Sequence, residues 1–441
     1  MQDKKVSDTD VRGVGPISPT RRRILGSLGA AGAAVTGLAT AHAQPSGRKG
    51  EAQVADAPEI GHTEDHVPYI GRHQAGIVSP RPLAGMVASF GVLAQNRDEL
   101  EQLFRTLTKR IAFLTQGGTP PTLDPKLPPA ESGILGPVIH PAGLTITVSV
   151  GASLFDERFG LADRKPRHLH AMTSFSNDAL DASLCHGDLS IQFCANTGDV
   201  ILYALRDIVK TMPGLLLVNW KQEGIVPPVT ATKGQKPGSA RNYLGFRDGS
   251  ANPDSNDTEQ MKKIVWVQPG SGEPDWAVDG TYQVVRIIRN FVERWDRTPL
   301  QEQEAIFGRV KVSGAPLDGG KSEFDIPDYA KDPKGKITPM DSHIRLANPR
   351  SAQSEANLIL RRPFNYSNGV TKSGQLDMGL LFICYQADLY KGFITVQSRL
   401  NGEPLEEYIK PVGGGYFFTL PGIRDRDDWL GRTLLENSRI S

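Results

Sequence analysis

The chain has 441 residues, of which 39% are hydrophobic and 22% charged, and its formal net charge at pH 7 is +1. This composition is typical of a globular protein with a large core, and it excludes a disordered or collagen-like chain. The near-zero net charge gives no indication of nucleic-acid binding, and three cysteines without metal-like spacing indicate no disulfide framework.

The first 43 residues have the layout of a cleaved export signal. Three arginines at 21–23 precede a weakly apolar run from Ile24 to Thr40, and Ala41-His42-Ala43 is a small-x-small cleavage motif. The run is rich in Gly, Ala and Thr, which argues against a membrane anchor. The arginines resemble those of twin-arginine signals, which export folded proteins. We therefore predict a twin-arginine signal peptide over residues 1–43 and a periplasmic location.

Residues 44–66 are polar and without pattern, which predicts a disordered linker. From Val67 to residue 225 the patterns of strands and helices follow the order β-α-β-β-α-β, which is that of a ferredoxin-like unit. The expected strands lie at 85–93, 144–155, 188–197 and 214–224, and the expected helices at 97–116 and 197–212.

Much of this order recurs in residues 226–441. The sequence therefore predicts an α+β fold with two ferredoxin-like halves packed together, 67–225 and 226–441, of the dimeric α+β barrel type. A long insertion at 311–342, rich in Gly, Pro and Asp, is expected to line a site. The expected strands of the second half lie at 280–292, 355–367, 379–388 and 414–422, and its expected helices at 298–310 and 389–402.

Few catalytic motifs occur in the chain. No glycine-rich phosphate loop follows a strand, and there is no His-Glu-x-x-His, Cys-x-x-Cys or nucleophile-elbow motif. In YLGFRDGSANPD, residues 243–254, Arg247 and Asp248 lie between two glycines. This stretch is either an ordinary surface turn or a tight loop that presses against a flat group and points its acid at it. His343, beside two arginines at the end of the insertion, is a candidate metal ligand, although most lone histidines are not.

GFRDG (245–249) resembles the Gly-x-x-Asp-Gly signature of the dye-decolourising peroxidases, which are haem enzymes with a double ferredoxin-like fold. The resemblance runs from about residue 70 to the C-terminus. It points to the branch of periplasmic peroxidases of iron-uptake systems, also described as haem deferrochelatases. The other matching motifs are HQAGI (73–77), CHGDLSIQFCAN (185–196), HIRLANPR (343–350), LILRRPFNY (358–366), GLLFICYQADLYKGF (379–393) and GGGYFF (413–418).

The resemblance implies a haem b cofactor, iron protoporphyrin IX, held by His343 as the proximal iron ligand. Such a histidine usually donates its second ring N–H to an acceptor. Asp388 is our candidate for this acceptor, although its position before Leu389 suits a helix N-cap equally well. One carboxylate could serve both purposes.

On the opposite, distal face the family's aspartate and arginine correspond to Asp248 and Arg361. The aspartate would move a proton between the oxygens of peroxide, and the arginine would stabilise the developing charge. An aspartate base implies activity at low pH, and Arg247 is expected to meet a haem propionate or solvent. Arg350 is expected to pair with a propionate. The other residues expected to contact the cofactor are Gly245, Phe246, Gly249, Ser250, Ala251, Asn252, Asn348 and Pro349.

Three functions are compatible with this set of residues. The first is a peroxidase that uses hydrogen peroxide to oxidise dyes, phenols or ferrous iron. The second is a deferrochelatase that releases iron from haem and leaves the tetrapyrrole intact. The third is a haem carrier, which would have no use for Asp248 and Arg361. The family resemblance also suggests periplasmic iron-uptake components as partners, and a homodimer.

Overall fold

The N-terminal half forms the predicted β-α-β-β-α-β unit. The computed structural model describes residues 62–229 and 238–436. The four strands of this half pair in the antiparallel order β2-β3-β1-β4, as in ferredoxin-like sheets. Its elements are β1 (Ala84–Val92), α1 (Arg97–Gln116), β2 (Thr145–Gly151), β3 (Leu189–Ala195), α2 (Gly198–Thr211) and β4 (Leu216–Ile225).

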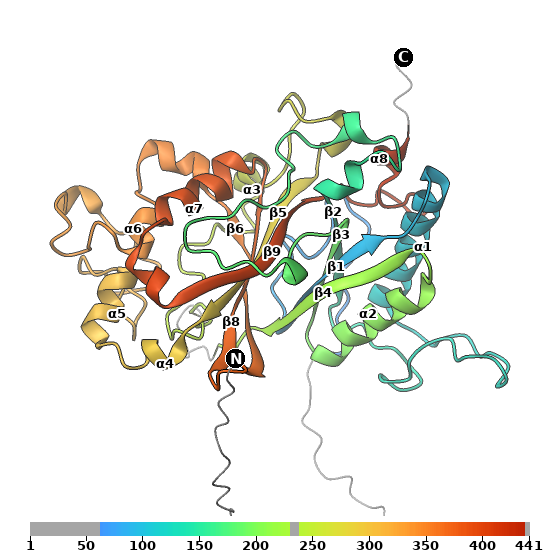
Figure 1. Cartoon of the computed structure of the whole chain (residues 1–441), viewed down its shortest axis with the longest axis horizontal. Coiled ribbons are helices and arrows are strands. Elements are labelled where there is room, and N and C mark those ends of the chain that lie inside the picture. Colours follow the sequence, from blue (N-terminus) through green and yellow to red (C-terminus); the bar gives the residue numbers. More distant parts are fainter. Residues whose placement is uncertain (1–61, 230–237, 437–441) are drawn as a thin grey trace, which may run out of the picture. The chain divides into compact units, whose positions relative to one another are not determined.

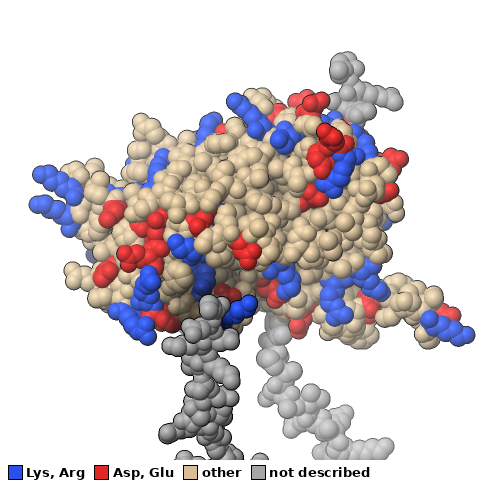
Figure 2. Space-filling model, viewed as in Figure 1, with Lys and Arg blue, Asp and Glu red and all other residues tan. Residues whose placement is uncertain are grey.

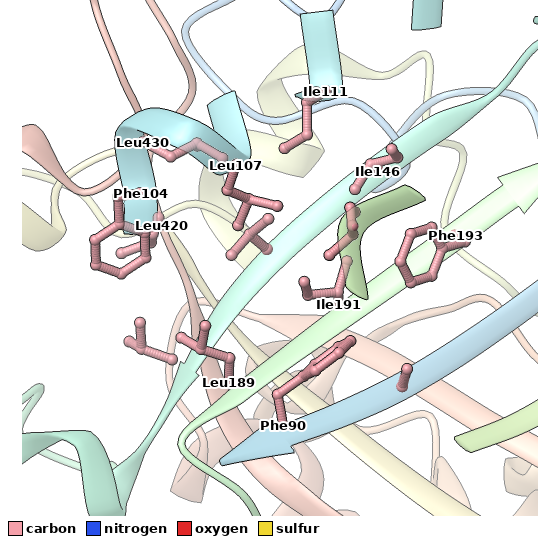
Figure 3. Close-up of a cluster of buried hydrophobic side chains, with 14 of the residues drawn as sticks. Phe90, Phe104, Leu107, Ile111, Ile146, Leu189, Ile191, Phe193, Leu420 and Leu430 are labelled. Carbon is pink, nitrogen blue, oxygen red and sulfur yellow. The ribbon is translucent and has the colours of Figure 1, made fainter. Parts of the chain in front are cut away.

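Helix α1 buries one apolar face against the N-terminal sheet. It begins after Asn96, whose side chain accepts a hydrogen bond from the backbone N–H of Glu99 at 3.0 Å and so caps the helix. Leu107 and Ile111 are spaced one turn apart and point toward the strands, and they belong to the same buried cluster as Phe193 (Figure 3). All three side chains are at most 2% exposed, so this surface of the sheet is a closed core.

The C-terminal half repeats the arrangement with shorter helices. Its strands pair in the antiparallel order β9-β5-β8-β7, with the two-residue β6 on β8. The single strand predicted at 355–367 is divided at Arg362 and Pro363, because proline has no N–H to donate to a neighbouring strand. The elements are α3 (Thr258–Ile264), β5 (Thr281–Asn290), α4 (Val292–Trp295), α5 (Leu300–Phe307), α6 (His343–Ala347), β6 (Leu360–Arg361), β7 (Phe364–Val370), β8 (Leu376–Gln386), α7 (Thr395–Leu400), β9 (Ile409–Thr419) and α8 (Arg432–Leu435).

The two sheets join along both edges and close into a ring of strands. Strand β2 pairs with β9, and β4 pairs with β7 through Ile225 and Asn365. The inward side chains of strands from both halves, among them Val87, Ile287 and Leu381, pack together inside this ring. In Figure 1, α1 and α2 lie beside the N-terminal strands, and α6 and α7 lie beside the C-terminal strands. The structure therefore confirms the predicted α+β fold of two packed ferredoxin-like halves.

The structure describes the chain from residue 62, which is before Val67, where the patterned sequence was expected to begin. The backbone C=O groups of Thr63 and Asp65 accept hydrogen bonds from Ala142 and Gly143 at 2.7 and 2.6 Å, so the end of the predicted linker packs on the body of the protein. The rest of the linker and the predicted export signal lie outside the described residues. No helix in residues 62–229 or 238–436 is both long and apolar enough to span a bilayer. Figure 2 shows basic and acidic side chains interspersed over one face.

Candidate active site

A cavity lies against the outer face of the C-terminal sheet, and we call it the C-half cavity. Side chains alternate along a strand, so Val285 and Ile287 of β5 point into the ring while Ile288 points outward to the cavity. Leu380 and Phe382 of β8 extend this apolar floor. The other walls come from the loop that contains Asp248, from α6, and from the segment that leads into α7. Phe393 of that segment, and Val396 and Leu400 of α7 itself, face the cavity.

Asp248 and Arg361 form an ion pair at the cavity wall. Nη1 of Arg361 donates to Oδ1 of Asp248 at 2.6 Å, although the two residues are far apart in the chain. Asn252 fixes their approach, because its amide makes two bonds to the backbone of Arg361. Its Oδ1 accepts from the N–H of Arg361 at 2.8 Å, and its Nδ2 donates to the C=O at 3.0 Å. Asn252 therefore joins the loop to β6. It had been expected to contact the cofactor, but it is not part of the cavity wall.

The loop around Asp248 is a tight hairpin. The N–H of Asp248 donates to the C=O of Ala240 at 2.8 Å. Gly245 has φ +85° and Gly249 has φ +151°, which side-chain-bearing residues rarely adopt. A Cβ at Gly245 would lie 2.6 Å from Lys311, so this glycine accommodates a neighbouring side chain. The tight loop inferred from the sequence is thus present.

His343 is the first residue of α6 and lines the same cavity. Its Nδ1 lies 2.7 Å from Oε2 of Glu403, a carboxylate that is 5% exposed. The acceptor predicted from the sequence, Asp388, was therefore wrong. The Oδ1 of Asp388 accepts from the N–H groups of Tyr390 and Lys391, both at 3.0 Å, so Asp388 has the N-cap role that was its alternative.

Glu403 controls the protonation of His343. Burial lowers the pKa of His343, but the negative charge and hydrogen bond of Glu403 outweigh burial, so the pKa lies above its ordinary value of 6.5. With Nδ1 engaged by the carboxylate, Nε2 is the ring nitrogen available to a ligand. Phe307 packs beside the ring, with 5.9 Å between the centroids, and helps to fix its orientation.

Four further arginines line the cavity, and one of them, Arg286, is paired with Asp178. Arg309 is 5% exposed and donates through Nη1 to the C=O groups of Gly314 and Glu323. Arg247 donates to the C=O of Ser239 at 2.6 Å and lies near the Glu323 carboxylate. Arg350 is exposed, with φ +59°, a left-handed conformation that residues with a side chain seldom adopt. This part of the cavity wall therefore carries several positive charges.

Most of the residues proposed from the sequence meet at the cavity. Gly245, Pro349 and Asp388 do not belong to its wall, and neither does Asn252. Sequence reasoning missed Glu403, whose one local signal is the following Pro404, typical of a helix start. The proposed residues that line the cavity are Phe246, Asp248, Gly249, Ser250, Ala251, His343, Asn348, Arg350 and Arg361.

The cavity fits a haem on three counts. Its apolar floor of Ile288, Leu380 and Phe382 suits a porphyrin ring, and the arginines suit two propionates. The imidazole of His343 has one nitrogen held by a carboxylate and the other free, which is the usual state of a histidine that binds metal.

The chain matches two family models, "Dyp-type peroxidase, N-terminal" over residues 74–226 and "Dyp-type peroxidase, C-terminal" over residues 239–424. It is 56% identical to a deferrochelatase of Shigella sonnei over 419 residues, which covers 95% of this chain and 97% of that protein. A deferrochelatase of Yersinia pseudotuberculosis is 54% identical over 428 residues, with coverage of 95% and 96%.

Comparison with solved structures points to the same family. A DyP-type peroxidase from Cellulomonas bogoriensis has a TM-score of 0.75 and 34% identity, and the match covers 86% of this chain and all of that one. Ferric DtpA from Streptomyces lividans has a TM-score of 0.76 and 31% identity, with coverage of 87% and 100%. The chain thus belongs to the Dyp-type peroxidases, a family of haem enzymes, as the sequence motifs predicted.

Proposed function

We propose that this haem enzyme reduces hydrogen peroxide in the C-half cavity, with His343 as the iron ligand and Asp248 and Arg361 as the peroxide-handling pair. The observation that carries the proposal is that His343 lines the same cavity as the Asp248–Arg361 pair. A haem held by His343 would supply the redox chemistry of the reaction. The substrates are hydrogen peroxide and a reductant, which a dye, a phenol or ferrous iron could provide.

The protein's own contribution is to move a proton and stabilise charge. The Asp248 carboxylate accepts the proton from one oxygen of hydrogen peroxide and delivers it to the other oxygen, which leaves as water. The Arg361 guanidinium, 2.6 Å from Asp248, stabilises the negative charge that develops as the O–O bond breaks. The reductant supplies two electrons. With these electrons and two added protons, one hydrogen peroxide is converted into two waters. Glu403 holds the imidazole of His343 in place.

Asp248→Asn tests this role. The amide keeps the size of the side chain but is not a base, so we expect peroxidase kcat/KM to fall by about a hundredfold or more. Dye oxidation by the holoprotein should be measured between mildly acid and neutral pH, with haem content determined for each preparation. Parent-like rates at equal haem content would exclude Asp248 as the base. The parent should be more active at acid pH, as a carboxylate base allows.

Removal of iron from haem is the second candidate function. It is supported by the 56% identity to proteins named deferrochelatase over almost the whole chain. Anaerobic incubation of holoprotein with a reductant and a ferrous chelator should then yield metal-free protoporphyrin. Its fluorescence provides the measurement, and intact haem after prolonged incubation would contradict this activity. A simple haem carrier is disfavoured, because a carrier has no need for the Asp248–Arg361 pair.

Export by the twin-arginine route to the periplasm is part of the proposal and is supported by the sequence of residues 1–43. Replacement of Arg21, Arg22 and Arg23 by lysine should leave the precursor in the cytoplasm, which cell fractionation would show. Contacts with iron-uptake components, and a homodimer, stay predictions. Sedimentation of the holoprotein would test the dimer, and a single monomeric species would exclude it.

A further inference from the structure

The insertion between α5 and α6 reaches both sides of the C-half cavity. On one side, the backbone C=O of Asp332 accepts from Arg345 of α6, the helix that begins with His343, at 2.8 Å. On the other side, Glu323 contacts the hairpin that carries Asp248. The insertion therefore joins the two elements that hold the iron ligand and the distal acid.

Glu323 binds both ends of the hairpin. Its carboxylate is 5% exposed. Oε1 accepts from the backbone N–H of Ser239 at 2.8 Å, and Oε2 accepts from Oγ of Ser250 at 2.7 Å. Ser239 lies just before Ala240, the partner of the Asp248 N–H, and Ser250 lies two residues after Asp248. One carboxylate thus holds together the two arms of the hairpin beside the distal acid.

The surroundings keep Glu323 ionised and in place. Burial raises its pKa, but the hydrogen bonds from Ser239 and Ser250 and the charge of Arg247 outweigh this effect, so the pKa is lowered. Nε of Arg247 lies 3.8 Å from Oε1. Gly314 gives the two side chains room, because a Cβ there would lie 2.8 Å from both Arg247 and Glu323.

We propose that Glu323 is a positioning residue that sets the place of Asp248 opposite Arg361. Glu323 is not part of the cavity wall, so it acts through the hairpin and not on peroxide itself. Ionised acceptors make the stronger hydrogen bonds in proteins, which suits a group that fixes a loop. The inference rests on the proposed function, since it assigns Glu323 a role only through Asp248.

Glu323→Ala in the holoprotein provides the test. The rate constant for its reaction with hydrogen peroxide, followed by stopped-flow absorption, should fall about tenfold to a hundredfold, because a shift of ~1 Å in a catalytic group can cost this much. Haem content and the position of the Soret band should not change. Asp325→Asn is the matched control, because the Asp325 carboxylate accepts from the backbone N–H groups of Lys321 and Ser322, which both lie in the insertion. Its rate constant should equal that of the parent.

A double-variant cycle separates positioning from a general structural effect. If Glu323 acts through Asp248, adding Glu323→Ala to Asp248→Asn should lower the rate constant less than twofold further. Losses that multiply in the double variant would overturn the proposal, as would a Glu323→Ala rate constant within about twofold of the parent.

Ser250→Ala is the second variant, and it decides the matter if Glu323→Ala does not fold or load haem. It removes one of the two hydrogen bonds and should lower the rate constant about threefold or more. A parent-like rate constant for Ser250→Ala would then overturn the proposal. Failure of the proposed function itself is recognised separately, because Asp248→Asn alone would then react with peroxide as fast as the parent.

Discussion

The two ferredoxin-like halves have the same strand order but use the outer faces of their sheets differently. In the N-terminal half, α1 and α2 are 20 and 14 residues long and fill this face with a closed apolar core. In the C-terminal half, α5 has 8 residues and α7 has 6, and the outward side chains of β5 and β8 face a cavity. The same topology therefore yields a core or a site, depending on how much helix covers the sheet.

The approach to α7 shows how the C-terminal helix differs. Residues Tyr390–Ile394 form a π-helical turn in which Gly392 departs from helical geometry, with φ −81° and ψ −105°. A Cβ at Gly392 would lie 2.8 Å from the side chain of Gln386, so a glycine allows this close approach to β8. Such π-helical turns are frequent at functional sites. Phe393, within the turn, lines the cavity.

His343→Ala should have the largest effect, which is a loss of haem from the C-terminal half. It removes the one ring nitrogen that we assign to the iron, so the purified protein should contain almost no haem, while the N-terminal core is untouched. Absorption spectra after addition of hemin, together with circular dichroism, provide the measurement. His140→Ala is the control, because His140 is exposed and pairs with Glu64, and neither residue lines the cavity. A normal Soret band in His343→Ala would refute the assignment.

Truncation of one phenylalanine in each half should sharpen the comparison. Phe193→Ala in the closed core should reduce the free energy of unfolding by about 3–5 kcal/mol. Phe382→Ala should cost less, about 1–2 kcal/mol, because this side chain borders a space that is already open. Urea denaturation of the two apoproteins measures both losses.

The affinity for hemin should show the reverse order, with the greater loss in Phe382→Ala. Equal losses of stability in the two variants would mean that the outer faces of the two sheets are packed alike.

The smallest expected effect concerns pH. Because Glu403 raises the folded-state pKa of His343 above 6.5, protonation of His343 stabilises the folded apoprotein. This stabilisation is fully present below pH 6.5 and is lost as the pH rises through the raised pKa. Glu403→Gln removes the charge, burial then dominates, and the stabilisation at acid pH should disappear. Nuclear magnetic resonance titration of His343 and urea denaturation at several pH values would show this. An unchanged titration in Glu403→Gln would contradict it.

Local sequence patterns predicted most elements, with errors where tertiary contacts decide. The apolar spacing of α1 placed that helix correctly over 97–116, because the residues that form its buried face recur with helical periodicity in the sequence. The strand expected at 355–367 failed at Pro363, and its first residues form a 3₁₀ turn, Ala352–Asn357. The pairing of Arg361 with Asp248 was predicted through family motifs and not through spacing.

The sequence by itself determined the two ferredoxin-like halves, the tight loop at Asp248 and the family of haem enzymes, because periodicity, glycine positions and motifs are local properties. Only the tertiary structure decided that Glu403, rather than Asp388, holds His343, and that Asn252 and Glu323 anchor the Asp248 loop. These contacts join residues 60 to 109 positions apart in the chain. Carboxylates and amides that cap turns locally look the same in sequence as those that reach across a fold, so packing alone distinguishes them.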